Sequence, residues 1–259
     1  MRLIALLTDF GLEDPYVGVL KGVIFGIAPQ ARLVDISHAV PAGDIRWGAC
    51  QLWSARPYFP PGTIFVAVVD PGVGSARQPV AVAAAGQYFI GPDNGLLSWA
   101  VPEPASGVLL DRPRWQLPAV SNTFHGRDIF APAAAHLAAG VSLTELGSPL
   151  DGLKQLAWPS SVPVAGGLQG EILLWDHFGN LITSLSAAEL AALGSGSTLR
   201  FAIGHTQIQG LSSCYSDAAA NAPLALIGSS GLLEIALNGG SARARLKAQI
   251  GQRVFVTAT

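Results

Sequence analysis

Short apolar runs and amphipathic stretches alternate along the first third of the chain. The apolar runs lack polar alternation, which is typical of strands buried on both faces of a parallel sheet. The stretches between them carry apolar residues three and four positions apart, as amphipathic helices do. In chain order, the predicted strand, helix, strand, helix and strand cover residues 2–7, 14–28, 33–36, 44–58 and 64–69. This alternation predicts an α/β domain with three layers and a mostly parallel sheet.

Caps and turn residues mark further elements of this first part. Asp44 precedes the second helical stretch and is predicted as its N-cap. Two later apolar runs predict strands, a third predicts the start of a short helix, and an alanine-rich run predicts a helix that Gly140 ends. These four runs cover residues 80–84, 87–90, 96–100 and 133–139.

The pattern changes between Leu150 and Gly170, where proline, serine and glycine replace the apolar periodicity. We therefore predict an N-terminal domain over residues 1–157, a linker over 158–169 and a C-terminal domain over 170–259. Short strands separated by glycine, serine and asparagine turns predict an all-β, barrel-like fold for the second domain, with one helical turn at 187–193. The predicted strands cover residues 171–175, 181–184, 198–203, 206–208, 224–227, 232–237 and 253–256.

Composition narrows the class of protein. Charged residues make up 12% of the 259 positions, well below the roughly 25% of ordinary soluble proteins, so we expect a dense core or surface buried against partner subunits. Mean hydropathy is +0.41, yet no apolar run reaches the ~18 residues of a membrane span. The N-terminus shows no signal-peptide pattern, which predicts a cytoplasmic protein. A net charge of −2 without lysine or arginine runs argues against nucleic acid and anionic membranes as partners.

Several common site types are missing from the sequence. There is no Walker loop, no GxGxxG after the first strand and no GxSxG elbow, which argues against nucleoside triphosphates, dinucleotides and serine-hydrolase chemistry. Cys50 and Cys214 lie far apart and form no metal-type cluster, so we expect both to be buried small hydrophobic residues.

Chemistry-bearing residues gather where predicted strands end and where a helix begins. Asp70 directly follows the strand at 64–69, and Arg77 lies seven positions on, across a glycine-containing loop. Ligands of open α/β sheets bind beyond the carboxyl ends of strands. His125 precedes the alanine-rich helix and supplies an imidazole. Together these residues predict an acid–base site with a permanent cation.

Simpler interpretations of these residues stay open. Asp70 and Arg77 are also compatible with a surface turn, His125 with a structural histidine, and the Arg127-Asp128 pair with an ion pair and helix cap. Metal ligation by Asp70, His125 and Asp9 lacks a spaced pair such as HxxxH, so no metal is expected. In the C-terminal half, the loops at 176–180 and 228–231 hold ligand-type residues, although such turns are also common in hairpins.

Motifs along essentially the whole chain, in matching order, resemble the S-adenosylmethionine hydroxide adenosyltransferases, which are related to bacterial fluorinases and chlorinases. The resemblance implies hydrolysis of S-adenosyl-L-methionine to adenosine and L-methionine, with no cofactor. It also implies an α/β domain, a C-terminal barrel, and a homotrimer with active sites between subunits. The motifs cover residues 8–11, 16–18, 21–22, 70–74, 91–95, 123–128, 176–180 and 238–242.

Within this superfamily, Asp70, Arg77 and His125 together are similar to the water-using branch. Halogenases surround a desolvated halide with small or uncharged groups, and a buried carboxylate would repel a halide by several kcal/mol. Our hypothesis is that Asp70 or His125 removes a proton from water, while Arg77 orients Asp70 and holds the developing hydroxide. A chlorinase-like halogenase stays the alternative for this site.

The resemblance also implies residues that bind the substrate. Asp9 takes the ribose hydroxyls, Phe10 and Gly11 shape its loop, and Phe124 lies near the reacting carbon. The C-terminal residues act from a neighbouring subunit. Asp176 binds the ammonium group, Ser229 the carboxylate, Phe178 stacks on adenine, and Asn180 with the Asn238-Gly239 backbone contacts its edge.

One departure and two rival functions remain. Ser230 stands where halogenases have arginine, which predicts weaker carboxylate binding. A non-catalytic adenosine- or S-adenosylmethionine-binding protein, and a metal-dependent hydrolase, are the alternatives from other classes.

Overall fold

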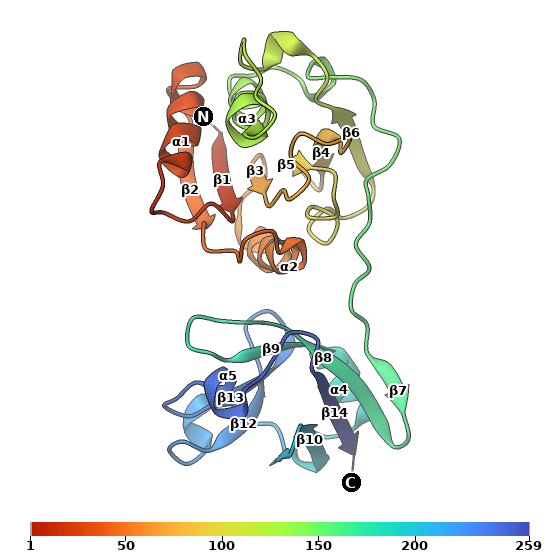
Figure 1. Ribbon diagram of the computed structural model, residues 1–259. Helices are drawn as coiled ribbons and strands as arrows, with labels where there is room; N and C mark the ends of the chain where they lie inside the picture. The colour runs from red at the N-terminus through yellow and green to blue at the C-terminus, as the bar shows by residue number, and fades with distance from the viewer. Residues whose placement is uncertain (1, 259) are drawn as a thin grey trace. The chain divides into compact units, whose positions relative to one another are not determined.

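The computed structural model describes residues 2–258 and divides into two compact units, one ending at Ala157 and the other beginning at Trp158 (Figure 1). The first unit is α/β and the second is all-β and barrel-like apart from short helices. The predicted fold class is confirmed in this form. Within the described residues, no helix is long and apolar enough to cross a membrane.

The first unit is built on a mixed six-stranded sheet with the strand order β2-β1-β3-β5-β4-β6. Four neighbouring strands, β2, β1, β3 and β5, are parallel, whereas β4 runs antiparallel to β5 and β6. The reversal follows from a two-residue hairpin, since Ala85 and Gly86 both have positive φ as a type I′ turn requires. The strands are β1 Leu3–Thr8, β2 Arg32–Ser37, β3 Ile64–Val68, β4 Pro79–Ala84, β5 Gln87–Pro92 and β6 Ala105–Leu109.

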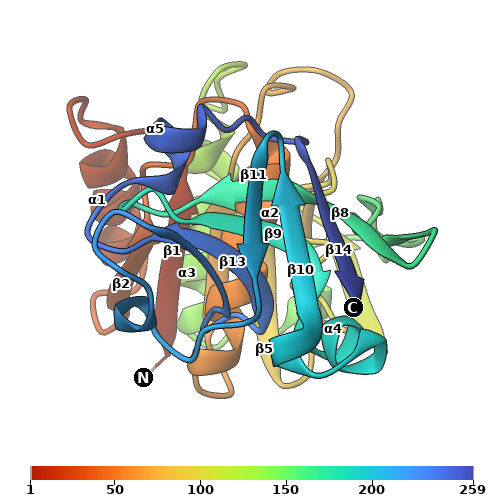
Figure 2. The ribbon, with the colours of Figure 1, turned by 90° about the horizontal axis from the view of Figure 1, so that it is seen from below.

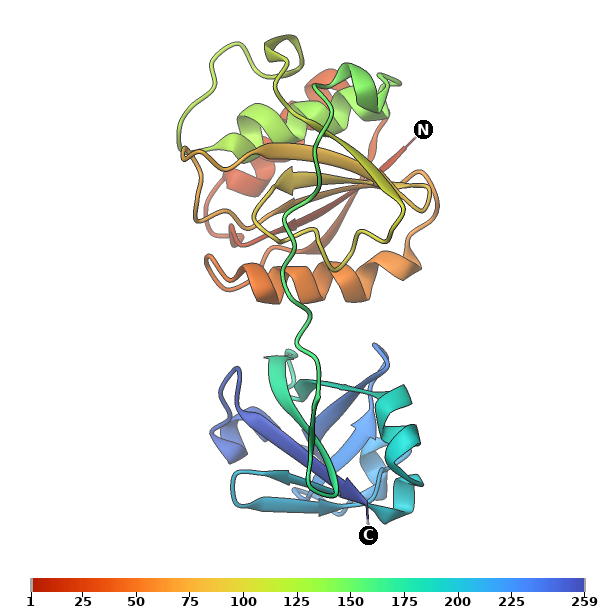
Figure 3. The ribbon, with the colours of Figure 1, turned by 90° about the vertical axis from the view of Figure 1, so that its right-hand side faces the viewer.

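Helices cover both faces of this sheet. Figure 3 shows α1 (Tyr16–Ile27) and α3 (Ala131–Ala138) on one face and α2 (Ile45–Ala55) on the other. Their apolar stripes are buried against β1 and β3, whose residues are almost wholly inaccessible to solvent. The predicted N-cap is confirmed, because the Asp44 side chain accepts a hydrogen bond from the Trp47 amide at 2.9 Å.

Two elements of the first unit differ from the prediction. Residues 96–100 form turns rather than a helix, since the Ser98 hydroxyl donates to the Gly95 carbonyl and accepts from the Leu156 amide, competing with helical bonding. Strand β6 was not predicted, because its first residues are exposed and carry no apolar alternation.

The second unit is an antiparallel sheet with the order β11-β10-β14-β8-β9-β13-β12, to which β7 adds beside β8. The long strand β8 pairs with β14 through its first half and with β9 through its second half, which curves the sheet around an apolar core. Figure 2 shows β10, β14 and β8 in this order. The elements are β7 Val162–Val164, β8 Gly167–Trp175, β9 Leu181–Ser186, α4 Ala187–Leu193, β10 Leu199–Ile203, β11 Thr206–Gln209, β12 Pro223–Ile227, β13 Leu232–Leu237, α5 Ala242–Leu246 and β14 Arg253–Ala258.

The segment predicted as a linker, 158–169, holds β7 and the start of β8.

The two cysteines, Cys50 and Cys214, differ in their exposure to solvent. Cys50 is buried, which raises the pKa of its thiol to about 12 and leaves it unreactive. Cys214 is exposed, contrary to the prediction, because its Sγ lies in a surface turn, 3.2 Å from Asp217 Oδ1.

The cap of α2 gives a test of the local structure. Replacing Asp44→Ala removes the acceptor for the Trp47 amide and should lower the free energy of unfolding by about 1 kcal/mol. Asp44→Ser retains a capping oxygen and should stay close to the parent protein. Urea denaturation of the full chain measures both, and equal losses in the two variants would contradict the capping role.

Candidate active site

The parallel pairing of β1 and β3 brings two carboxylates to one edge of the sheet. Thr8 and Val68 are partners in the register, so Asp9 and Asp70 follow neighbouring strand ends. The end of β3 is held further by Asn94, whose amide donates to the Val69 carbonyl at 2.9 Å. This is the edge at which ligands of α/β sheets bind.

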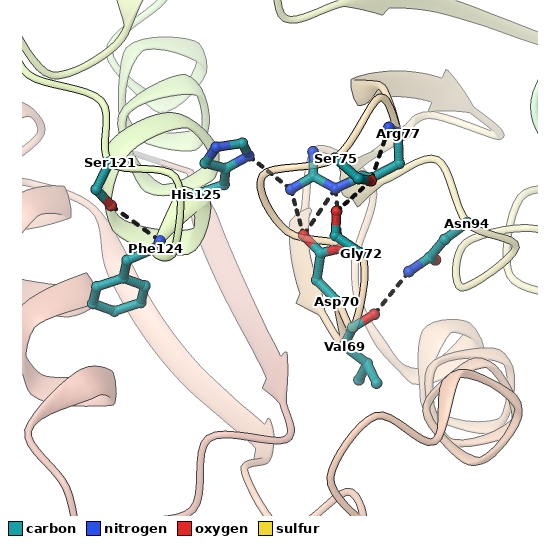
Figure 4. Close-up of polar contacts among 9 residues, drawn as sticks. All are labelled: Val69, Asp70, Gly72, Ser75, Arg77, Asn94, Ser121, Phe124 and His125. Carbon is teal, nitrogen blue, oxygen red and sulfur yellow. Dashed lines mark hydrogen bonds and ion pairs between the residues drawn. The ribbon is translucent and has the colours of Figure 1, made fainter.

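Asp70 and Arg77 form a buried ion pair. The Nε of Arg77 lies 3.0 Å and 2.9 Å from the two oxygens of Asp70, and its Nη2 donates to Oδ2 (Figure 4). The side chains are only 5% and 9% exposed. The intervening loop needs glycine at Gly74, which has positive φ and on which a Cβ would overlap the Asn122 carbonyl oxygen. This close approach sets the loop against the segment that carries His125.

His125 joins the same guanidinium. Its Nδ1 lies 2.8 Å from Arg77 Nη2 (Figure 4). Because a guanidinium only donates, Nδ1 accepts this hydrogen bond, and the neutral ring then carries its proton on Nε2. Burial lowers the pKa of His125, and the positive charge of Arg77 lowers it further. The charges of Asp70 and Asp128 and a hydrogen bond with the Ser121 backbone act to raise the pKa without reversing the shift, so the net effect favours the neutral imidazole.

The neighbouring ion pair builds the loop that presents His125. Asp128 is completely buried and accepts from Arg127 Nε at 2.6 Å and from the Ser121 amide at 2.8 Å. Burial acts to raise the pKa of Asp128, but the hydrogen bonds of Arg127 and Ser121 outweigh it and lower the pKa overall. Ser121 also accepts from the Phe124 amide at 3.1 Å. The Arg127-Asp128 pair is thus the predicted ion pair, and its role is structural.

A cavity of about 220 Å³ opens between these loops. Asp70 and His125 line it, whereas Arg77 does not and lies behind them. Phe10 and Phe124 form one wall, with ring centroids 5.7 Å apart in an edge-to-face arrangement. The full lining is Asp9, Phe10, Gly43, Val68, Asp70, Pro71, Val73, Thr123, Phe124, His125 and Gly126.

The second unit has a larger pocket of about 640 Å³. Asp176 accepts from the backbone amide of Asn180 at 2.8 Å and from its side chain at 2.9 Å. Phe178 is 73% exposed. An aromatic ring exposed to this extent is typical of a surface that binds a ligand or a partner. The full lining is Asp176, Phe178, Asn180, Tyr215, Leu237, Gly239, Gly240 and Ser241.

Three further residues from the sequence prediction stand outside both linings. Gly11 lies at the root of its loop, with positive φ and its amide bonded to the His38 carbonyl. Ser229 lies in the β12–β13 turn, and Asn238 uses its side-chain amide to hold the Ala218 carbonyl at 2.7 Å. Their proposed contacts with a ligand are not tested by this geometry.

Gly43 and Tyr215 are among the pocket residues that were not predicted from the sequence. Gly43 lines the N-terminal cavity, and Tyr215 lines the C-terminal pocket, where its hydroxyl donates to Glu234 at 2.6 Å. Burial raises the pKa of Glu234. In the sequence, the feature that pointed to the contact between Tyr215 and Glu234 was a carboxylate within the otherwise apolar strand β13. Among the described residues, no group of three or more histidine, cysteine or acidic side chains is arranged to hold a metal ion.

Two models of known protein-family domains match this chain. The profile of the SAM hydroxide adenosyltransferase N-terminal domain matches residues 4–147, and that of the C-terminal domain matches residues 170–255. The chain belongs to the SAM hydroxide adenosyltransferase family. The resemblance inferred from the motifs is confirmed.

Relatives in this family carry two kinds of name. Proteins named (R)-S-adenosyl-L-methionine hydrolase include one from Thermus thermophilus, 43% identical over 98% of this chain and 99% of its own. Another, from Salinispora arenicola, is 40% identical over 98% and 97% of the two chains. A fluorinase from an Actinoplanes species is 32% identical over 75% of each chain. The crystal structure of an uncharacterized conserved protein from Thermotoga maritima superposes with a TM-score of 0.91 at 33% identity, covering 98% and 99%.

Removing the guanidinium tests the electrostatics of the site. In Arg77→Met, the pKa of His125 should rise, because the positive charge that disfavours the imidazolium is lost while Asp70 stays nearby. His136 is the internal control, since burial alone lowers its pKa. NMR titration of the histidine ring protons follows both groups. An unchanged or lower pKa of His125 would contradict the assignment.

Proposed function

We propose that this chain hydrolyses S-adenosyl-L-methionine to adenosine and L-methionine. The observation that carries the proposal is the convergence of Asp70, Arg77 and His125, with Asp70 and His125 facing the N-terminal cavity. The two hydrolase relatives, similar over nearly their whole length, support the same reaction.

The reaction is an in-line displacement at the ribose 5′ carbon. A water oxygen attacks this carbon, the carbon–sulfur bond breaks, and its electron pair neutralises the sulfonium as methionine leaves. Because the leaving group is already charged, the protein mainly supplies position and a better nucleophile. The proton of the water passes to a base and then to solvent.

The geometry favours Asp70 as that base. The Nδ1 lone pair of His125 is engaged by Arg77, so the neutral ring has no free acceptor with which to take the proton of the water. Asp70 lines the cavity as an acceptor-only carboxylate and takes the proton from the water. Arg77 orients both groups from behind the cavity wall, which supports the orienting role over direct contact with the hydroxide.

The same groups disfavour a halide as nucleophile. A carboxylate 4 Å from a halide costs about 4 kcal/mol at an effective dielectric constant near 20, and Arg77 offsets only part of this. Water, unlike a halide, can donate a hydrogen bond to the Asp70 carboxylate. Hydrolysis is therefore favoured over halogenation.

Substrate contacts in the N-terminal cavity follow the family resemblance. Asp9 binds the ribose hydroxyls, with Phe10 and Gly11 shaping its loop. Phe124 packs near the reacting carbon. Asp9 Oδ2 accepts from the Gly43 amide at 2.8 Å, which fixes one oxygen and supports this role.

The C-terminal pocket holds the remaining contacts in the proposal. Asp176 binds the methionine ammonium group and Ser229 its carboxylate, both charge-assisted contacts. Phe178 stacks on adenine, while Asn180 and the Asn238-Gly239 backbone contact its edge. The exposed face of Phe178 supports the stacking role.

A homotrimer, in which a neighbouring copy supplies the C-terminal pocket, is part of the proposal. The N-terminal cavity, at about 220 Å³, is smaller than the roughly 300–1,000 Å³ that drug-sized ligands occupy. The water-activating residues and the exposed aromatic ring lie in different units of the chain. The absence of a cofactor and the cytoplasmic location stay predictions from the sequence.

Turnover by matched variants tests the function. Asp70→Asn keeps the size of the side chain but weakens its ability to accept a proton, so kcat should fall by about 10²- to 10⁴-fold, while adenosine affinity changes little. Asp151→Asn, at an exposed carboxylate, should leave kcat unchanged. Chromatography of adenosine and methionine measures the rate.

Three outcomes would contradict the proposal. The first is the formation of 5′-chloroadenosine in chloride in place of adenosine, which would indicate a halogenase. The second is loss of activity with a metal chelator, which would indicate a metal-dependent hydrolase. The third is binding of S-adenosyl-L-methionine without any turnover, which would indicate a binding protein.

A further inference from the structure

Four polar side chains form a continuous series of contacts beside the N-terminal cavity, and none of them lines it. Lys21 Nζ lies 2.7 Å from Asp35 Oδ2, and Asp35 Oδ1 lies 3.1 Å from His38 Nε2. His38 Nδ1 lies 2.8 Å from Thr8 Oγ1. The series begins on α1 at the surface and ends on a completely buried hydroxyl at the carboxyl end of β1.

The chemistry of these groups fixes the direction of the contacts. Asp35 only accepts when ionised. Burial acts to raise its pKa, but the hydrogen bonds and charges of Lys21 and His38 lower it overall. When His38 Nδ1 carries no proton, the Thr8 hydroxyl donates to it. The Thr8 oxygen is then free to accept from the Phe10 amide, 3.2 Å away.

The segment that begins with His38 also holds the β1–α1 loop through its backbone. The His38 carbonyl accepts from the Gly11 amide at 2.8 Å. Five residues on, the Gly43 amide donates to Asp9 Oδ2 at 2.8 Å. The loop around Asp9 is therefore held at Phe10, at Gly11 and at the carboxylate itself. His38 contacts Gly11 directly and reaches Phe10 only through Thr8.

We propose that His38 is a positioning residue that sets the place of Asp9 in the cavity through Thr8 and the Gly11 amide. The inference rests on the proposed contact of Asp9 with the ribose hydroxyls. His38 does not touch the cavity, and its side chain is only 3% exposed, so its effect reaches the substrate through the loop. Asp35 Oδ1, which Lys21 holds through the other oxygen of the carboxylate, lies 3.1 Å from His38 Nε2 and places a negative charge beside the ring.

Buried, directional contacts of this kind make the loop position sensitive to single atoms. Loss of the Thr8 hydroxyl leaves His38 Nδ1 and the Phe10 amide without their partner in a water-poor environment. Movement of the loop is a cheaper response than leaving both groups unsatisfied. A shift of about 1 Å in a substrate-positioning group is enough to cost a large factor in rate or affinity.

The experiment compares Thr8→Val with Thr8→Ser in the full chain. Valine removes the hydroxyl at nearly constant shape, so KM for S-adenosyl-L-methionine and the Kd for adenosine should rise about ten- to hundredfold, with a smaller change in kcat. Serine retains the hydroxyl and should restore both constants to within about threefold. Equal constants in the two variants would overturn the inference.

A second pair of variants, at Asp35, tests the same inference at a more exposed position. It keeps the test valid if the buried variant Thr8→Val fails to fold. Asp35→Ala removes the partner of His38 and should raise KM, whereas Asp35→Asn keeps an oxygen acceptor and should raise it less. The same KM in both variants, close to that of the parent, would count against the proposal.

Amide hydrogen exchange at Phe10 and Gly11 separates this inference from the proposed function. Exchange should be faster in Thr8→Val than in Thr8→Ser, whatever the substrate is. If the parent protein neither binds adenosine nor turns over S-adenosyl-L-methionine, the proposed function fails. If exchange is equal in the two variants, the positioning role of His38 fails.

Discussion

The site depends on one guanidinium group. Arg77 binds Asp70 through Nε and Nη2 and His125 through Nη2, and its own side chain is 9% exposed. A buried carboxylate beside a half-buried imidazole would be costly without this cation, because removing one partner of a buried pair typically costs about 3–5 kcal/mol. Buried ion pairs add little net stability compared with apolar packing, so the arrangement is better explained by the orientation that it imposes on Asp70 and His125.

That orientation separates the roles of two groups that both have the chemistry of a base. The donor on Arg77 occupies the Nδ1 lone pair of His125, and the positive charge of Arg77 disfavours the imidazolium, so the neutral ring has no free acceptor. Asp70 lines the cavity, and its carboxylate only accepts hydrogen bonds. In the proposed mechanism, Asp70 therefore takes the proton of the water that attacks the sulfonium-bearing carbon.

Residues at element ends were predictable from the sequence, whereas contacts between distant loops were not. Asp9 and Asp70 follow buried strands, and the parallel order of those strands places both at one edge. The direct contact between Arg77 and His125 depends on Gly74 packing against the Asn122 backbone, which no local pattern encodes. For the same reason the family resemblance, rather than periodicity, supplied the roles of the binding residues.

The same distinction between local patterns and distant contacts holds for the fold. Strands with buried apolar runs were predicted closely, while β6 was missed because it pairs at the sheet edge with exposed residues. Tyr215 escaped notice because its partner Glu234 lies 19 positions away and on another element. The contact between His38 and Thr8 was not predictable from local pattern, since it crosses from the end of β2 to β1.

The tautomer of His125 tests the central claim most directly. Nitrogen-15 NMR of histidine-labelled protein, recorded at about pH 8 where the ring is neutral, distinguishes a protonated from an unprotonated ring nitrogen. The account predicts a proton on Nε2 and an unprotonated, hydrogen-bonded Nδ1. A proton on Nδ1 would mean that Arg77 does not hold the ring, and it would contradict the division of roles between Asp70 and His125.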